Sequence, residues 1–402
     1  MKKKKNPILA IFLTVFIDML GVGIMIPVFA PLIIQNEIGI VPAHYSEAYR
    51  HIIYGFLTAT FSIFQFFGAP ILGALADQHG RKKILSFSIW GTIIGYVFFA
   101  LALYLKSLPL VFLARMIPGF TGGNISIALA ALADVSDEES KAKNFGLIGM
   151  SFGLGFILGP AIGGFLSTYD YSLPLWFTAL LSFFNWVLVR IQFPETFLPK
   201  EKRKVSLLTG FRNIGKAFRY KNIQVILLVL FLMSFGFTFF TQFFQVFMIK
   251  KYNASTKDIA IIFTYIGVWI AFTQGAITRY VSKFFKPNEI LKYSLIGMSL
   301  SMLFLLIPDN YYFIFVFHPM LAVSQGLTQP NITALISNLG TTENQGETLG
   351  IQSSVQSIAF AIPPIVAGFI SAINFQLPII VGSIFLMLSW LVFIVFFRVK
   401  ES

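Results

Sequence analysis

The chain has 402 residues, of which 56% are hydrophobic and only 12% are charged, and its formal net charge is +13. Soluble domains normally carry about a quarter charged residues, so this composition, with a mean hydropathy of +0.78, excludes a soluble globule and indicates an integral membrane protein. Cysteine is absent, which excludes disulfide and thiolate chemistry.

Apolar segments with helical patterning follow one another along the whole chain. A helix needs roughly 20 apolar residues to cross about 30 Å of hydrocarbon, and each of these segments is about that long or longer. Twelve membrane-spanning helices are therefore predicted, at residues 8–34, 52–76, 84–105, 109–133, 144–168, 173–194, 222–249, 258–280, 288–306, 311–338, 346–372 and 376–397.

Asp18, in the first span, is by this topology the only acid deep inside a span. A carboxylate there costs on the order of 3 kcal/mol or more, so it normally faces a cavity, pairs with a cation or binds a proton. Arg115, in the antiparallel fourth span, lies about 20 Å from the side on which the first span starts, and Asp18 about 16 Å from it. We hypothesise that Asp18 takes up a proton or a cationic substrate in alternation, and that a nearby Arg115 favours the ionised carboxylate. The alternative is a static pair that holds the helices together.

The connection between the second and third spans, 73–83, combines a glycine, an acid and a basic cluster, which suits a loop on which a transporter hinges. Gly73 allows close approach of a neighbouring helix, and Asp77 lies near a helix end where its charge meets a dipole or a basic partner. Arg81, after Gly80, is expected to pair with Asp134 on the same side of the membrane. The alternative is that these charges only anchor a loop among lipid headgroups.

Small residues recur at four-residue spacing in the fifth span. This spacing lines one helix face and allows two helices to pack at short distance, while a proline inside the helix frees a carbonyl and bends it. The residues are Gly155, Gly159, Pro160, Gly163 and Gly164. Generic close packing explains them as well as a functional role does.

Neutral amides occur in spans of both halves. Because such groups are costly in lipid, they are expected to face protein or water, where they either line a polar pocket or join helices together. The set is Gln65, Asn124, Gln242, Gln245, Gln325, Gln329, Asn331, Gln352 and Gln356.

The spans divide six and six around a segment rich in Lys and Arg. We predict an N-terminal bundle at 1–194, a cytoplasmic linker at 195–221 and a C-terminal bundle at 222–402. Internal repetition supports the division, since 119–126 recurs at 326–333 and a glycine and proline pattern in 146–167 recurs at 350–371. A weaker internal repeat relates Gly275 to Gly73. Two parallel repeats with a substrate site between them permit alternating access by rocking.

The basic residues fall mainly on one side of the predicted topology. With both termini in the cytoplasm, the ratio of Lys and Arg between the two sides is roughly four to one, which predicts that orientation in a cell (plasma or inner) membrane. The positive charge is then explained by topology and contact with anionic membrane lipids rather than by nucleic acid.

Four stretches carry a resemblance to a known family: 17–27, 73–83, 114–134 and 155–164, with 194–196 and 345–346 fitting as well. The chain resembles the major facilitator superfamily, and within it the drug:proton antiporters around the tetracycline-efflux proteins. The resemblance implies an all-α membrane fold of twelve helices in two pseudo-symmetric six-helix bundles. It also implies that Asp77, Arg81 and Asp134 latch the cytoplasmic side, and it associates the fifth-span glycines with exporters. Tetracycline itself is disfavoured, because the third, eighth and ninth spans lack deep acids and histidines.

Three functional classes compete. The favoured one is a secondary active transporter that exports a small, mostly hydrophobic molecule in exchange for protons, acting as a monomer. The alternative is a facilitator or exporter of a neutral metabolite such as a sugar, without proton coupling. The third is a non-transporting sensor or membrane enzyme. An enzyme is disfavoured because no span carries paired carboxylates or a His/Asp/Glu cluster, and neither a cofactor nor a metal site is expected.

Overall fold

The computed structural model describes residues 7–36, 38–136, 138–196, 215, 223–339 and 345–397. Every regular element in these ranges is helical. The basic residues predicted for the linker between Lys200 and Lys221, and those at Lys2 to Lys5, Arg398 and Lys400, lie outside the described residues.

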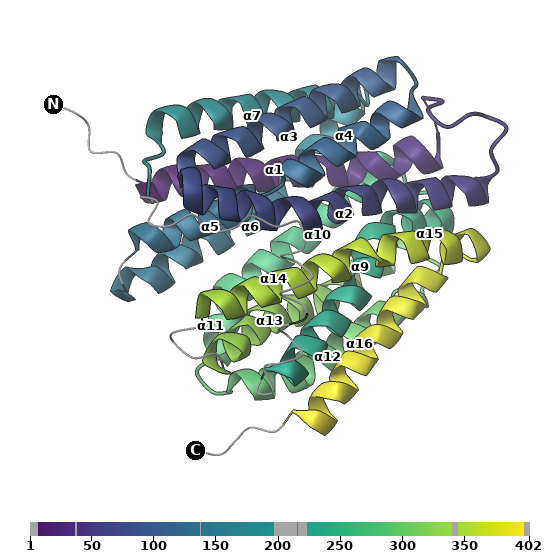
Figure 1. The fold of residues 1–402 in the computed structure, drawn as a ribbon. Coiled ribbons are helices and arrows are strands. Elements are labelled where there is room, and N and C mark those ends of the chain that lie inside the picture. Colours follow the sequence, from purple (N-terminus) through teal and green to yellow (C-terminus); the bar gives the residue numbers. More distant parts are fainter. Residues whose placement is uncertain are drawn as a thin grey trace. The chain divides into compact units, whose positions relative to one another are not determined.

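Helices occupy all the predicted spans (Figure 1). Among the described residues, ten spans meet the length and hydropathy of a membrane crossing, and the other two predicted spans are α12 and α13. The helices are α1 (Pro7–Ile34), α2 (Glu47–His79), α3 (Arg81–Tyr104), α4 (Leu108–Thr121), α5 (Asn124–Val135), α6 (Glu138–Ser167), α7 (Leu173–Gln192), α9 (Gln224–Tyr252), α10 (Thr256–Phe272), η1 (Thr273–Ile277), α11 (Thr278–Val281), α12 (Pro287–Phe304), η2 (Tyr311–Phe313), α13 (Ile314–Leu339), α14 (Gln345–Ala361), α15 (Pro363–Ile373) and α16 (Leu377–Phe396).

Local sequence explains several helix ends. Proline occupies the first or second position of α4, α7, α12, α15 and α16, where its missing N–H costs no intrahelical hydrogen bond. The Ser107 hydroxyl accepts a hydrogen bond from the Leu110 N–H and caps α4. Asn253 ends α9 in the left-handed conformation, with φ 50°.

Three spans that were predicted as continuous helices are interrupted. The fourth divides into α4 and α5 at Gly122 and Gly123, and the eleventh into α14 and α15 at Ile362, before two prolines. The eighth contains the π-helical turn η1, a widening that is rare in helices and frequent at functional sites. Hydropathy does not mark these interruptions, because each lies inside a segment that is long and apolar enough to cross a membrane.

Contacts divide the chain into two compact units. Unit 1 comprises Met1–Tyr45, Thr60–Thr209 and Ser255–Thr264, and unit 2 comprises Ser46–Ala59, Gly210–Ala254 and Tyr265–Ser402. Each unit thus takes a short segment from the opposite half of the sequence, namely the start of α10 in unit 1 and the start of α2 in unit 2. The division into 1–194, 195–221 and 222–402 stays a prediction.

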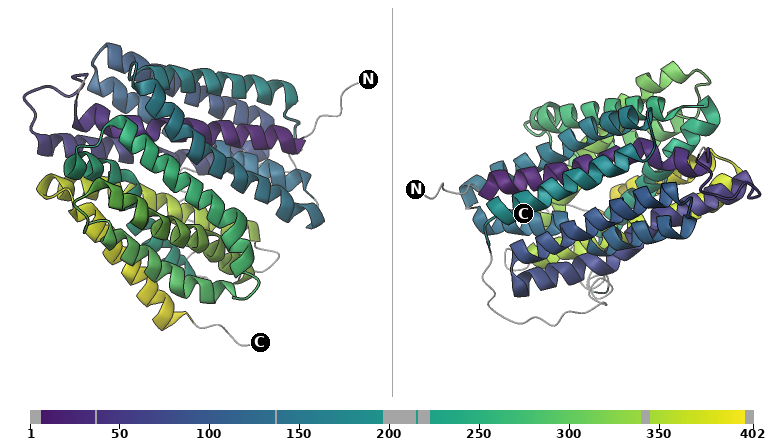
Figure 2. Two further views of the ribbon diagram at one scale, coloured as in Figure 1. Left: turned by 180° about the vertical axis from the view of Figure 1, so that it is seen from behind. Right: turned by 90° about the horizontal axis from the view of Figure 1, so that it is seen from above.

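Within unit 1, α1 packs most extensively against α6 and also contacts α5 and α7, while α3 packs on α4 and α7 (Figures 1 and 2). Mostly aliphatic side chains of α1, α2, α3, α5, α6 and α7 form one buried core in this unit. Within unit 2, α9 packs on α16, and α12 packs on both α13 and α16.

Candidate functional site

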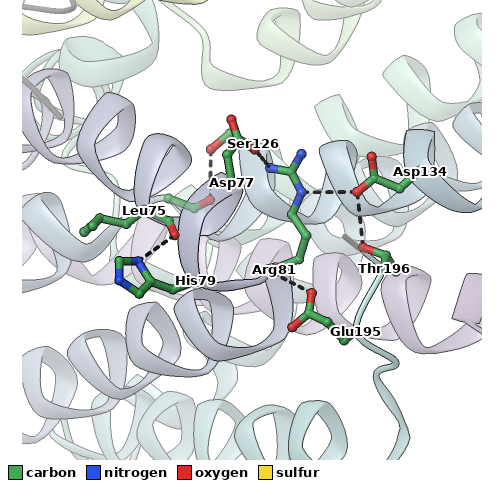
Figure 3. Close-up of polar contacts among 9 residues, drawn as sticks. Leu75, Asp77, His79, Arg81, Ser126, Asp134, Glu195 and Thr196 are labelled. Atoms are coloured by element: carbon green, nitrogen blue, oxygen red, sulfur yellow. Dashed lines mark hydrogen bonds and ion pairs between the residues drawn. The ribbon is translucent and has the colours of Figure 1, made fainter. Parts of the chain in front are cut away.

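Arg81 is the centre of a polar network at one end of unit 1 (Figure 3). Its Nη1 lies 2.7 Å from Asp77 Oδ1 on α2, and its Nε donates to Asp134 Oδ2 on α5 at 3.2 Å. The Thr196 hydroxyl donates to the same Asp134 oxygen at 3.2 Å. Because Arg81 is buried, these two partly covered carboxylates supply the countercharge that a buried guanidinium needs.

Glu195, which follows α7, caps the first turn of α3. Its two carboxylate oxygens accept the backbone N–H groups of Arg81 at 2.7 Å and Lys82 at 3.3 Å. An anion at this position satisfies N–H groups that have no intrahelical partner and interacts favourably with the helix dipole. The network therefore joins the end of α2, the start of α3, the end of α5 and the chain leaving α7.

Gly80 is the only residue between α2 and α3. Its φ of 95° lies in a region that favours glycine, and a Cβ placed on it would collide with the carboxylate of Glu195. A residue with a side chain would thus disturb both the sharp joint and the cap of α3.

Two expectations for this connection require correction. Residues 73–79 belong to α2, so the expected loop reduces to Gly80 alone. An added Cβ on Gly73 would meet nothing within 4 Å among the described atoms, so the predicted close approach of a helix is wrong in this conformation. The predicted contact of Arg81 with Asp134 is present, and the basic partner of Asp77 is also Arg81. The roles of Glu195 and Thr196 were missed, and no local pattern links them to a helix more than a hundred residues earlier.

Asp18 lies at mid-length in α1 and is half-buried. Its Oδ1 accepts a hydrogen bond of 2.9 Å from the Asn124 amide, which begins α5. The same amide nitrogen lies 3.4 Å from the Thr92 hydroxyl on α3, and the Asn124 oxygen is buried without a hydrogen-bond partner among the described residues. A carboxyl group, an amide and a hydroxyl thus meet where three helices converge.

Arg115, on α4, lies beside two aromatic rings. Its guanidinium carbon lies 5.0 Å from the centre of the Phe29 ring and 4.9 Å from that of Phe61, within the range of cation–π attraction. The charges of Arg115 and Asp18 both act on the hydroxyl of Tyr96. Tyr96 therefore lies within electrostatic range of both groups, whereas the direct pairing of Asp18 with Arg115 stays a prediction.

The fifth-span glycines pack α6 against α1 beside Asp18. A Cβ on Gly155 would lie 2.6 Å from Met19 Cβ, and one on Gly159 would lie 2.6 Å from Gly23 Cα. Gly163 faces the Ile24 backbone, and a Cβ on Gly23 would lie 3.1 Å from Pro160 Cδ. Gly164 faces the other way, toward Ala260 at the start of α10. The stripe thus holds the helix that carries Asp18 at a distance only glycine permits.

Gln65 stabilises the interruption of the fourth span. Its side-chain N–H donates to the Gly122 carbonyl at 3.2 Å, and this contact joins α2 to the break between α4 and α5. Backbone groups that lose their helical partners at membrane depth need such replacements. The break in turn makes Asn124 the first residue of α5, next to Asp18.

The remaining predicted amides lie in unit 2 and play different parts. The Asn331 amide donates to the Leu327 carbonyl at 2.7 Å, and Gln352 donates to the Thr333 hydroxyl at 3.1 Å. The side-chain oxygens of Gln245, Gln325 and Gln352 are buried without a hydrogen-bond partner among the described residues. Gln242 contributes its backbone carbonyl to the Tyr54 hydroxyl, and it is half-buried, as are Gln329 and Gln356.

Comparison with known proteins decides the family. The sequence model of the Major Facilitator Superfamily matches residues 11–362 and 290–402. The chain belongs to the major facilitator superfamily. The predicted membership is thus confirmed, and the chain is a multi-pass membrane protein of a transporter family.

Relatives within the superfamily match almost the whole chain. Multidrug resistance protein 1 of Bacillus subtilis (strain 168) is 30% identical over 384 residues, covering 94% of this chain and 92% of that protein. Quinolone resistance protein NorA of Staphylococcus aureus (strain MRSA252) is 27% identical over 381 residues, covering 92% of both.

Solved structures share the superfamily fold. The human organic anion transporter MFSD10 superposes with a TM-score of 0.75 at 21% identity, covering 98% of this chain and all of that one. A D-xylose-proton symporter gives a TM-score of 0.74 at 16% identity, covering 95% and 97%. The predicted all-α membrane fold is therefore confirmed. Among the described residues, no group of three or more His, Cys, Asp or Glu side chains is placed to hold a metal ion.

Proposed function

We propose that this protein is a secondary active exporter that exchanges protons for small, mostly hydrophobic, drug-like molecules by alternating access. Two relatives spanning nearly the whole chain are named for multidrug and quinolone resistance. The observation that carries proton exchange is the Asp18 carboxyl, placed at mid-length in a membrane-spanning helix and bonded to the Asn124 amide. An ionisable group at that depth is a functional site by default.

Asp18 takes up and releases the proton in this proposal. The Asn124 amide donates to the ionised carboxylate, and its free oxygen can receive the proton of the carboxylic acid after rotation of the amide. The charge of Arg115 and the hydroxyl dipole of Tyr96 act differently on the ionised and the protonated forms of Asp18. A lipophilic cation can replace the proton as the partner of the carboxylate.

The Arg81 network acts as the cytoplasmic latch. Its ion pairs with Asp77 and Asp134 and the Glu195 cap join four segments of unit 1, so opening that end requires their rearrangement. The fifth-span glycines keep α1 fixed while this happens. We place both termini in the cytoplasm of a plasma-membrane protein and expect a monomer, with the bundles at 1–194 and 222–402 rocking about the linker at 195–221.

Transport in reconstituted vesicles tests the proposal. The probes are a fluoroquinolone and a fluorescent lipophilic cation, each with and without an imposed pH gradient. The Asp18→Asn variant is expected to lose gradient-driven accumulation by tenfold or more and to retain counterflow exchange. Asp309→Asn, which removes an exposed loop acid, is the control and should behave as the native chain. Gradient-driven accumulation at the native rate in Asp18→Asn would refute proton exchange at this residue.

A second candidate is an uncoupled facilitator of a neutral metabolite such as a sugar. It is favoured by the buried amide oxygens of Gln245, Gln325 and Gln352, which suit the hydroxyl groups of such a ligand. Transport of sugars that ignores the pH gradient, with no transport of the drug-like probes, would establish this alternative.

A further inference from the structure

A second titratable site lies within unit 2, whereas Asp18 belongs to unit 1. His51, one turn into α2, is buried with 3% of its surface exposed. Its Nδ1 lies 2.8 Å from the hydroxyl oxygen of Ser371 on α15, a residue 320 positions away. Its Nε2 is buried and has no hydrogen-bond partner in the part of the chain that the structure describes.

The charged neighbours of His51 come from α2 and α9. Glu47, one turn earlier on α2, places Oε1 3.8 Å from His51 Nε2. The same carboxylate contacts Lys250 on α9, and Arg50 on α2 also acts on it. From α15 the described neighbours are neutral. The Glu47 carboxylate thus interacts with two cations, Lys250 and Arg50, and with His51, which becomes a third cation when it is protonated.

A small cavity of about 240 Å³ opens beside this group. Glu47, Ala48 and His51 line it from α2, and residues 371–375 line it from the end of α15. Because the Glu47 side chain is largely exposed, water and protons reach the cavity from the aqueous phase. In the proposed topology this is the side opposite the cytoplasm, and the Arg81 network lies at the other end of α2.

The start of α2 packs closely on the helices that carry Ser371 and Lys250. Gly55 faces the Pro364 carbonyl and Gly368 on α15, and the Tyr54 hydroxyl donates to the Gln242 carbonyl on α9 at 2.8 Å. The contact between His51 and Ser371 is therefore part of a packed surface. If residues 46–59 move away from α15, the contact between His51 and Ser371 must break.

The corresponding contact in unit 1 contains no histidine among the residues that the structure describes. There Gly164 on α6, which the internal repeat matches to Gly368, faces Ala260 on α10. The Tyr171 and Thr256 hydroxyls bond at 3.0 Å across that contact, and Ser167, the counterpart of Ser371, bonds within its own helix. A histidine therefore occurs at the contact of α2 with α15 and not at that of α6 with α10. Since both contacts are closely packed, close packing alone does not require the histidine.

We propose that His51 is a second proton-binding site, whose protonation fastens the start of α2 to α15. A neutral imidazole carries one N–H, on either Nδ1 or Nε2. If the proton is on Nδ1, the lone pair of Nε2 faces the Glu47 carboxylate. If it is on Nε2, that N–H has no acceptor within hydrogen-bond range. When Nε2 binds a proton from the cavity, Nδ1–H donates to Ser371 and the new charge faces Glu47. Acid on this side therefore strengthens the contact, and neutral pH loosens it.

The absence of cysteine makes a direct test possible. Ala48→Cys and Asn374→Cys introduce a unique pair on the two exposed walls of the cavity, for spin labels. Their separation is measured from about pH 4 to about pH 8, a series that includes the usual titration range of histidine and more acidic values. We expect the short-distance population to grow on acidification by threefold or more. His51→Gln, which keeps a side-chain donor near Ser371 but cannot titrate, is expected to abolish that dependence. An unchanged pH response in His51→Gln, or no response in the parent pair, would overturn the proposal.

Two further variants keep the test decisive if His51→Gln does not fold. Glu47→Gln removes the countercharge, so the midpoint of the distance change should move to more acidic pH. Ser371→Ala removes the hydrogen-bond acceptor and should reduce the short-distance population at every pH. Native midpoints and populations in both variants would overturn the proposal. The measurement involves no transport, so its outcome is independent of whether Asp18 couples export to protons.

Discussion

The connection between α2 and α3 and that between α11 and α12 follow the second and eighth predicted spans, yet they are built differently. In the first, one glycine with φ 95° joins the helices, and the next residue, Arg81, bonds to carboxylates on two other helices. In the second, residues 282–286 are exposed, and Glu289 accepts the Lys286 N–H at 2.8 Å within the same short stretch. The first connection is held by distant segments and the second by its own cap.

This difference shows that the fold and the chemistry of the two halves have separate requirements. A helical span needs apolar residues of sufficient length, which both halves supply. A latch needs a buried cation whose partners lie on other helices, and only the first connection has one among the described residues. The weaker repeat of the Gly73 to Lys83 pattern in the second half therefore reflects duplication of the sequence more than a shared function.

Removing the cation should have the largest effect. Arg81→Ala leaves Asp77 and Asp134 facing each other without a countercharge, which costs up to about 3 kcal/mol, near the lower limit for a broken buried pair because both acids are partly exposed. We expect transport to fall tenfold or more with normal membrane insertion. The matched control is Lys283→Ala, which removes the same charge from the exposed second connection and should change transport by less than twofold. Equal losses in both variants would remove the distinction between the connections.

Changing the joint residue should have the next largest effect. Gly80→Ala forces a side chain into a conformation that costs about 1–3 kcal/mol and displaces the Glu195 carboxylate from the start of α3. A thermal-shift measurement on the purified protein should show a lower melting temperature and reduced transport. Ser282→Ala, in the second connection, is the control, since Ser282 has an ordinary helical φ of −65°. An unchanged melting temperature in Gly80→Ala would contradict the strained joint.

Loss of the cap should have a moderate effect. Glu195→Gln keeps one carbonyl acceptor for the N–H groups of Arg81 and Lys82 but loses the charge that the α3 dipole favours, at a cost of about 1 kcal/mol. Glu289→Gln makes the same change at the cap of α12. Both variants should lose similar stability in detergent, but only Glu195→Gln should slow transport. If Glu289→Gln slows transport equally, the second connection also participates in gating.

The sequence predicted the parts of this arrangement that are local or periodic. Apolar length predicted the spans, and the position of Asp77 near a helix end indicated a dipole or a basic partner for its charge. The structure shows that this partner is Arg81. The topology placed Asp134 on the same side, and the structure shows that contact. The latch itself is an implication of the resemblance to the superfamily.

Long-range and conformational features were not predictable in this way. Nothing near Glu195 indicates that it caps α3, because its partners are backbone N–H groups of a helix 114 positions away. The break at Gly122 and Gly123, which places Asn124 beside Asp18, lies in an apolar segment that reads as one helix. His51 lies one residue before the predicted span 52–76, whereas α2 begins at Glu47 and His51 is buried.

The smallest effect is expected where the two connections are most alike. Gly73 and Gly275 both lie inside helical segments, and a Cβ on either would meet nothing within 4 Å among the described residues. Alanine at either position should therefore leave folding intact and raise stability by about 0.5–1 kcal/mol, because glycine inside a helix loses more conformational freedom. Thermal shift and transport should be measured on both. If Gly73→Ala alone slows transport while its stability rises, a helix must approach Gly73 in another conformation of the cycle, which would restore the role that its motif suggested.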